Sequence, residues 1–304
     1  MNVLVTGGSG FIGSHTVDLL VKQGYTTIVV DQNKGVAENP NALYFYGDIT
    51  DHKLIEDLFT QHSLDAVIHL AAQVSVETSM KDPVLDVHVN VLGTLNLLEQ
   101  CRKHHAKIVF ASSAAVYGLP ENLPIAEDHP VHPISVYGLS KLTVEKYIQL
   151  YHEQFGVEYC TLRYSNVYGP RQGHTGEGGV ISIFLNKLTN GQAPFLFGDG
   201  EQTRDFIYVE DVAMANIYAL RDGKNQVFNV SSMTETSINS IVDTFTTLLN
   251  SDIQPIQQPP REGDITRSVL DASAIHSMLN WTPAVDIRSG LASTIRYFIE
   301  EKGL

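Results

Sequence analysis

The stretch Val3-Leu-Val-Thr-Gly-Gly-Ser-Gly-Phe-Ile-Gly13 decides the fold of this chain. It begins as a short apolar run, breaks into glycines and continues in a helical pattern, which predicts a strand, a tight turn and a helix. Gly7, Gly10 and Gly13 let the backbone turn sharply and approach a pyrophosphate closely. The N-terminus of the helix presents free N–H groups and a partial positive charge to phosphates. The stretch therefore predicts a dinucleotide-binding turn.

A second apolar strand, which covers residues 27–30, ends in Asp31. This acidic residue lies close to the offset of about 20 residues that is expected of a ribose-binding acid. A carboxylate at this place accepts hydrogen bonds from both ribose hydroxyls and repels a 2′-phosphate. The sequence therefore indicates NAD rather than NADP.

The composition bounds the class of protein. The 304 residues suffice for one large or two modest domains, and the formal net charge of −14 argues against nucleic-acid or anionic-membrane partners. Cys101 and Cys160 form no disulfide framework and suit a reducing compartment. Met1 leads straight into the first strand, and no apolar run is long enough to span a bilayer. We therefore expect a cytoplasmic protein.

Apolar runs alternate with helical patterns through the first half of the chain. The predicted strands cover residues 2–6, 26–31, 43–46, 65–70, 107–112 and 157–164, and the predicted helices cover 11–23, 51–62, 84–104 and 135–155. This alternation predicts an α/β fold of the Rossmann type, a doubly wound parallel sheet with helices on both faces. Ligands of such sheets bind at the carboxyl ends of the strands.

The second half changes character at Asn166, where a stretch rich in glycine and polar residues begins. Short predicted strands (194–197, 203–207, 226–230) then mix with predicted helices (180–190, 209–220, 237–249, 288–300), and residues 251–265 are expected to be irregular. We expect a first domain over 1–165 that binds NAD. A smaller α/β substrate domain over 166–304 is interleaved with it at the boundary.

The chemistry is predicted in the segment Tyr137-Gly-Leu-Ser-Lys141 at the start of a helix. A spacing of four places the tyrosine and the lysine on one helix face, where the ammonium is expected to lower the pKa of the phenol. Ser113 ends the preceding predicted strand, so its hydroxyl can reach the same substrate oxygen. These three groups beside a nicotinamide predict a proton-transfer site for alcohol–ketone chemistry.

Ten segments, two of which are described above, carry a family resemblance that runs nearly from end to end. They are Val5-Thr-Gly-Gly-Ser-Gly-Phe-Ile-Gly-Ser14, Gly47-Asp-Ile49, His69-Leu-Ala-Ala72, Asn90-Val-Leu-Gly-Thr94, Ser112-Ser-Ala-Ala-Val-Tyr-Gly118, Tyr137-Gly-Leu-Ser-Lys141, Arg163-Tyr-Ser-Asn-Val-Tyr-Gly-Pro-Arg-Gln172, Gly198-Asp-Gly200, Arg204-Asp-Phe-Ile-Tyr-Val-Glu-Asp-Val212 and Arg261-Glu-Gly-Asp264. With them the chain resembles the extended short-chain dehydrogenase/reductases. Within these it is most similar to nucleotide-sugar 4-epimerases of the UDP-glucose (UDP-galactose) 4-epimerase type.

The resemblance implies an NAD site and a catalytic site. The cofactor would contact the glycine turn, the ribose-binding acid, the adenine-flanking pair and the floor of the site: Gly7, Gly10, Phe11, Ile12, Gly13, Asp31, Asp48, Ile49, Leu70, Ala71 and Ala72. Tyr137 would be the catalytic base, Lys141 would bind the nicotinamide ribose, and Ser113 would hydrogen-bond the sugar O4.

The resemblance also implies a site for the UDP group. Diphosphate, uracil and uridine ribose would be held by Asn166, Gly179, Val180, Pro194, Phe195, Leu196, Arg204, Arg261 and Asp264. The arginines suit this role, because an anionic donor needs bidentate groups that are always charged. Ser268 stands where the family has a gatekeeper, and a small residue there leaves space for an N-acetyl group. We therefore hypothesise that UDP-GlcNAc and UDP-GalNAc are accepted; the alternative is that Ser268 has no effect on preference.

The resemblance also indicates which reaction is catalysed. Family 4,6-dehydratases and UDP-glucuronate decarboxylases carry carboxylates where this chain has Ala114 and Ala115. One proton-transfer tyrosine without a second acid–base pair suits epimerisation, in which C4 gives a hydride to NAD and receives it back on the other face. A UDP-glucuronate 4-epimerase, with Arg267 near the pocket, and a nucleotide-sugar dehydrogenase or reductase stay open. A silent NAD-binding regulator is disfavoured, because such proteins typically lose the tyrosine or the lysine.

Two further expectations concern metals and assembly. The twelve histidines show no paired ligand spacing, so no metal is expected. The predicted helices 84–104 and 135–155 carry more apolar residues than one buried face needs. In the family these helices form a four-helix contact, so we expect a homodimer.

Overall fold

The computed structural model describes residues 1–35, 37–173, 179–260, 263 and 265–302. Its centre is a parallel seven-stranded sheet in the order β10-β6-β5-β4-β1-β2-β3. These strands are β1 (Asn2–Thr6), β2 (Thr26–Asp31), β3 (Leu43–Tyr46), β4 (Ala66–His69), β5 (Lys107–Ser113), β6 (Tyr159–Tyr164) and β10 (Gln226–Val230). The predicted Rossmann-type doubly wound sheet is therefore confirmed.

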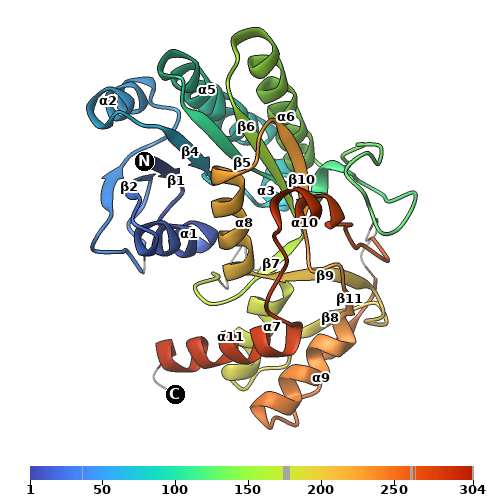
Figure 1. Ribbon diagram of the computed structural model, residues 1–304. Coiled ribbons are helices and arrows are strands. Elements are labelled where there is room, and N and C mark those ends of the chain that lie inside the picture. Colours follow the sequence, from blue (N-terminus) through green and yellow to red (C-terminus); the bar gives the residue numbers. More distant parts are fainter. Residues whose placement is uncertain (36, 174–178, 261–262, 264, 303–304) are drawn as a thin grey trace.

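Helices cover both faces of this sheet, because its strands bear apolar side chains on both sides. In β1, Val3 and Val5 face the core beneath α1 (Phe11–Lys22), α8 (Val209–Arg221) and α10 (Ser273–Leu279). Leu4 faces the opposite core, beneath α2 (His52–His62), α5 (Gly93–His104) and α6 (Val136–Phe155). Figure 1 shows α1 and α8 crossing in front of the sheet, with α5 and α6 behind it.

The predicted helix 84–104 is divided in the structure. Asp82 accepts a hydrogen bond from the Leu85 N–H (3.0 Å) and starts a short α4 (Pro83–Asp86), with Pro83 at its first position. A π-helical segment, η1 (Val87–Leu92), then leads into α5. A helix that the sequence analysis did not predict, α3 (Val76–Lys81), is capped by the side chain of Ser75.

A smaller lobe lies below the sheet in Figure 1. It contains one sheet of β7 (Asn166–Tyr168), β9 (Thr203–Tyr208) and β11 (Glu235–Ser237), and a second of β8 (Phe195–Phe197) and β12 (Ile256–Gln258). Helices α7 (Val180–Thr189), α9 (Ile238–Leu249) and α11 (Ile287–Lys302) enclose its own apolar core. The expectation of irregular backbone over 251–265 is wrong at β12, which pairs in parallel with β8.

The second half of the chain serves both layers. β10 pairs with β6 at the edge of the large sheet, and α8 packs against α1. The buried Lys107 ammonium of β5 donates to the carbonyls of Ala219 and Leu220 at 2.7 and 2.9 Å, which anchors the end of α8. The interleaving expected at residue 165 therefore extends to residues 209–230 and to α10, and the division into 1–165 and 166–304 stays a prediction. No helix in the described ranges has both the length and the apolar character to cross a bilayer.

Candidate active site

The carboxyl ends of the central strands open into a cavity of about 1050 Å³ between the two lobes. Most of the predicted site residues line it together: Gly7, Gly10, Phe11, Ile12, Gly13, Asp31, Asp48, Ile49, Leu70, Ala71, Ala72, Ser113, Tyr137, Lys141, Asn166, Gly179 and Val180. Segments that are far apart in sequence thus meet at one site, as expected of a doubly wound sheet.

The glycine turn forms a cradle that side chains would fill. Gly7 has a φ of +68°, and a Cβ on it would lie 2.7 Å from the Ala71 nitrogen. A Cβ on Gly13 would lie 2.0 Å from the Gly7 oxygen. No side chain of the described residues caps α1 at Gly10, which leaves its first N–H groups available to a phosphate. This cradle fits a pyrophosphate.

Asp31 is oriented at the end of β2 by two backbone groups. Ser9 N–H donates to its Oδ2 at 3.0 Å, and Asn33 N–H donates to its Oδ1 at 3.1 Å. A carboxylate has about four lone-pair sites, so acceptor capacity remains for ribose hydroxyls. The fit to a dinucleotide without a 2′-phosphate thus extends from the glycine turn to this carboxylate.

The floor of the cavity is fixed by a buried hydrogen-bond chain that the sequence analysis missed. Ala71 N–H donates to Thr6 Oγ1 (3.2 Å), which lies 2.7 Å from His69 Nδ1; His69 Nε2 lies 2.8 Å from Thr94 Oγ1. Because Thr94 donates to the Asn90 carbonyl (2.5 Å), it accepts from His69, so Nε2 carries a proton. Burial, and then Lys141, lower the pKa of His69 to about 3. A histidine inside an apolar strand was the available signal.

Ser113, Tyr137 and Lys141 converge as predicted. Ser135 caps α6 by accepting from the Gly138 N–H (3.0 Å), which places Tyr137 in the first turn and Lys141 one turn later. The side chain of Ser113, at the end of β5, interacts with the Tyr137 hydroxyl and favours its ionised form. The Lys141 Nζ lies 5.8 Å from the centre of the Tyr137 ring. The arrangement can move a proton at one substrate oxygen.

Burial dominates the titration of both groups. It raises the pKa of Tyr137 to about 12, against the hydrogen bond from Ser113, and it lowers the pKa of Lys141 to about 8, against Asp86 and Glu145. The expectation that Lys141 lowers the Tyr137 pKa is therefore wrong for this arrangement. The ammonium is instead directed to the Ala111 carbonyl, at 2.9 Å.

Several residues predicted for the UDP group do not line the cavity. Pro194 is buried ahead of the edge strand β8, the Phe195 ring contacts the Lys187 ammonium, and Leu196 packs on the small-lobe core. The Arg204 guanidinium donates to the carbonyls of Thr203 and Ile265. Ser268, three residues after Ile265, is half-buried. Arg261 and Asp264 lie outside the described residues. These roles stay predictions.

Arg171 and Gln172 line the cavity, although the sequence analysis gave them no role. Arg171 adopts a φ of +68°, and its Nη1 donates to Asp18 Oδ2 of α1 at 2.8 Å. His15, also on α1, lies 3.0 Å from the Pro170 carbonyl through its Nε2. The segment Pro170–Gln172 is thereby clasped onto the helix that begins at the glycine turn. Its Gly-Pro-Arg-Gln motif was the available signal.

Comparison with known proteins agrees with this geometry. The sequence model of the NAD dependent epimerase/dehydratase family matches residues 3–231. A UDP-glucose 4-epimerase from Thermotoga maritima, solved with UDP-glucose, is 40% identical with a TM-score of 0.97 over 99% of this chain and 100% of that one. A Thermus thermophilus UDP-glucose 4-epimerase complex with NAD is 37% identical, with a TM-score of 0.91 over 98% and 99%.

A third solved structure extends the range of sugars among the relatives. It is a UDP-N-acetylglucosamine 4-epimerase from Methanobrevibacter ruminantium in complex with UDP-N-acetylmuramic acid, 35% identical with a TM-score of 0.92 over 99% of this chain and 98% of that one. The family match spans well over half of the sequence, and the aligned structures span nearly all of it. This chain therefore belongs to the NAD-dependent epimerase/dehydratase family.

Proposed function

We propose that the protein is an NAD-dependent UDP-hexose 4-epimerase that acts on UDP-glucose and UDP-galactose. The observation that carries this is the meeting of Ser113, Tyr137 and Lys141 in the cavity opened by the glycine turn. Ala114 and Ala115 follow Ser113 in η2 (Ala114–Val116), so no second acid–base pair stands at that place. The solved relatives with UDP-glucose and with NAD support both ligands.

The chain's own residues would bind the ligands and move one proton. Bound NAD supplies the hydride acceptor and donor at C4 of the sugar. Tyr137, in its phenolate form, accepts the O4 proton and returns it, Ser113 orients O4, and Lys141 binds the nicotinamide ribose. Because burial favours the neutral phenol, this proton transfer depends on substrate and cofactor being in place.

The UDP group is proposed to bind where the cavity meets the small lobe. Gly179 precedes α7 without a side-chain cap from the described residues, so the N–H groups from Val180 onward suit a diphosphate. Asn166 lines the same region. Uracil and uridine ribose are assigned to Pro194–Leu196, Arg204, Arg261 and Asp264 on the family resemblance. Ser268 is the proposed determinant of N-acetyl sugar acceptance, with the M. ruminantium enzyme as a related precedent.

The test is direct. The purified protein is incubated separately with UDP-galactose, UDP-GalNAc and UDP-glucuronate without added NAD, and the anomeric protons are followed by NMR. We expect conversion of UDP-galactose to its 4-epimer, with the Tyr137→Phe variant as the inactive control. Conversion of UDP-glucuronate alone would favour the glucuronate epimerase. A stoichiometric need for added cofactor would favour a dehydrogenase or reductase.

We further propose that the protein is a homodimer and resides in the cytoplasm. The helices expected to form a four-helix contact expose apolar side chains, with Val84 of α4 78% exposed and Leu139 of α6 54% exposed. Val87 of η1 and Leu150 of α6 are also exposed. A second copy of the chain would cover these side chains. Free, buried Cys101 and Cys160 suit the reducing environment of a cytoplasm.

A further inference from the structure

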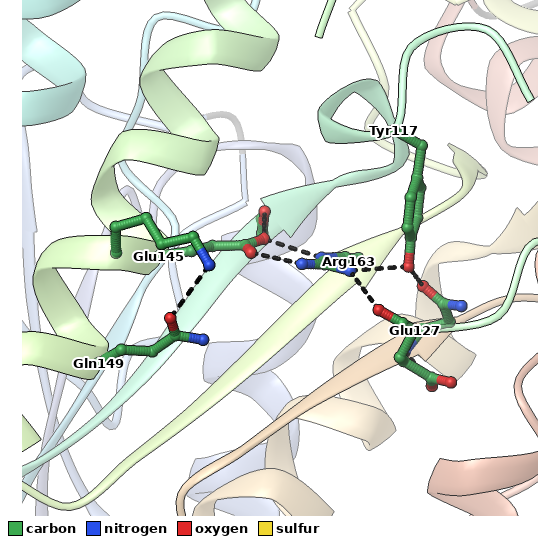
Figure 2. A network of polar contacts seen from close by, with 8 residues as sticks. Tyr117, Glu127, Glu145, Gln149 and Arg163 are labelled. Atoms are coloured by element: carbon green, nitrogen blue, oxygen red, sulfur yellow. Dashed lines mark hydrogen bonds and ion pairs between the residues drawn. The ribbon is translucent and has the colours of Figure 1, made fainter. Parts of the chain in front are cut away.

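The face of α6 that carries the proposed catalytic residues continues into a buried ion pair. Tyr137, Lys141 and Glu145 follow one another at intervals of four, so they share one side of the helix. Glu145 is fully buried, and it binds Arg163 of β6 through both carboxylate oxygens: Nη2 to Oε2 at 2.7 Å and Nε to Oε1 at 3.0 Å. Figure 2 shows this pair between helix and sheet.

The same carboxylate ties α6 to the strand that ends in Ser113. Ser112 Oγ donates to Glu145 Oε1 at 2.5 Å, and Ser112 lies opposite Arg163 in the register of β5 and β6. Ser113 is the next residue of the strand. Ser113 and Tyr137, which interact at the cavity, therefore come from the two elements that Glu145 joins.

An outer set of contacts holds the arginine from the other side. Arg163 Nη1 donates to the Tyr117 hydroxyl at 2.9 Å and to the Glu127 carbonyl at 3.1 Å. The Tyr117 hydroxyl donates in turn to Asn229 Oδ1 at 2.7 Å. In Figure 2 these contacts lie on the side of Arg163 opposite Glu145. Both charges of the pair thus have several hydrogen-bond partners, which a buried charge requires.

Stability alone does not explain such a pair, because well-packed apolar residues of similar volume often replace one without loss. Geometry gives a better reason. A displacement of about 1 Å between reacting groups can lower a rate about a hundredfold. Ser113 and Tyr137 come from different elements, so their separation depends on how α6 is seated against β5.

We propose that the Glu145–Arg163 pair, acting through Ser112, is a positioning element that fixes α6 against the end of β5 so that Ser113 and Tyr137 meet the same substrate oxygen. The proposal rests on the 4-epimerase function proposed above. It assigns Glu145, Arg163 and Ser112 a role in the reaction without contact with the reacting atoms.

The charge of Glu145 adds a second consequence. Burial lowers the pKa of Lys141, and Glu145, together with Asp86, opposes that effect. Removal of Glu145 therefore lowers the pKa of Lys141 further, so the ammonium is lost at lower pH. The titration of Lys141 therefore reports the charge of Glu145, whereas kcat reports the placement of Ser113 against Tyr137.

The test uses the double variant Glu145→Met/Arg163→Met, which removes both charges together and so leaves neither buried alone. We expect folded protein that retains NAD, a kcat lowered about tenfold to a hundredfold with KM unchanged, and an alkaline limb of kcat displaced to lower pH. Ser112→Ala, which cuts only the link to β5, should lower kcat in the same direction. Ser112→Ala also tests the proposal by itself if the double variant does not fold. Wild-type kcat and pH profile in both variants would overturn the proposal.

Tyr117→Phe is the matched control, and the NMR signal of the Tyr137 ring is a readout that does not depend on activity. Tyr117→Phe removes the outer hydroxyl but keeps the ion pair, so it should reduce stability and leave kcat unchanged. In protein carrying ¹³C-labelled tyrosine, the Tyr137 ring resonance, assigned by its loss in Tyr137→Phe, should shift in Ser112→Ala and in the double variant but not in Tyr117→Phe. This signal needs no turnover, so a wild type without epimerase activity would refute the proposed function and still leave the positioning testable.

Discussion

Lys141 links the burial of one residue to the pH dependence of the whole reaction. Burial lowers its pKa to about 8, so the ammonium is present below that pH and is lost as pH rises through it. We expect kcat to be level at neutral pH and to fall above about pH 8. In Lys141→Met we expect kcat to be about a hundredfold lower and to show no such fall at alkaline pH. The measurement is kcat for UDP-galactose against pH. Lys146→Met, an exposed lysine on the same helix, should keep the wild-type profile.

The same residue should weaken the fold at neutral pH. A folded pKa of about 8 against the ordinary 10.5 means that, between these values, the unfolded state binds more protons, so unfolding free energy rises with pH. The difference corresponds to about 3 kcal/mol at neutral pH. We expect Lys141→Met to be stabilised by roughly 1 to 3 kcal/mol at pH 7, since it also loses the bond to Ala111. Urea unfolding at several pH values tests this. An advantage that does not shrink between pH 8 and 10.5 would contradict it.

Ser268 is expected to determine which sugar is accepted and to take no part in proton transfer. If the small side chain leaves space for the N-acetyl group, Ser268→Tyr should depress kcat/KM for UDP-GalNAc by at least about tenfold and spare UDP-galactose, since a steric clash with an added group excludes only the larger substrate. The two substrates are compared by NMR in the same protein. Equal losses on both would sink the hypothesis and favour a residue without effect on preference.

At the scale of elements, the clasp of Pro170–Gln172 on α1 predicts how firmly the cofactor is held. The Arg171–Asp18 ion pair is partly exposed, with side chains 22% and 37% accessible, so it is worth about 1 kcal/mol or less. We expect Asp18→Ala to speed NAD release by a few-fold, measured as loss of bound NAD after dilution. Asp57→Ala, which breaks a more exposed ion pair with Lys53 on α2, is the control. Unchanged release in Asp18→Ala would show that the clasp does not retain the cofactor.

The elements differ in how far the sequence could predict them. β1, β2, β3 and β10 have the predicted bounds, because apolar runs bounded by turns mark buried parallel strands. β7, β11 and β12 have only three residues each and form through pairing with distant strands, so no local periodicity marks them. The division of helix 84–104 at η1 had no composition signal either.

The site shows the same limit. Gly7, Asp31 and Tyr137 lie in motifs whose spacing carries the chemistry, so the sequence sufficed to bring them to one cavity. The Thr6–His69–Thr94 chain joins residues 25 and 63 positions apart, and only the folded sheet makes it. The titration of Tyr137 was misjudged for a related reason, since spacing on a helix reveals the neighbouring lysine but not the depth of burial.

At the scale of the whole molecule, the exposed apolar side chains of α4, η1 and α6 predict a dimer in which a second copy of the chain covers them. Large apolar patches on a folded chain mark interaction sites, and a stable interface needs about 800 Å² from each partner. A charge buried without a counter-charge is strongly destabilising, so Leu139→Glu combined with Leu150→Glu should convert a dimer into a folded monomer. Analytical ultracentrifugation measures the mass.

The control for this prediction is Met278→Glu, which changes an equally exposed apolar residue, 57% accessible, on α10 of the opposite face. It should leave the mass of the assembly unchanged. Two results would refute the dimer through these helices: a wild type that sediments as a monomer at micromolar concentration, or a Leu139→Glu/Leu150→Glu variant that stays dimeric. Tyr137 lies in the first turn of the helix that bears Leu139 and Leu150, so loss of the partner should also lower kcat if the contact steadies that turn. Dimer loss with unchanged kcat would confine the contact to assembly.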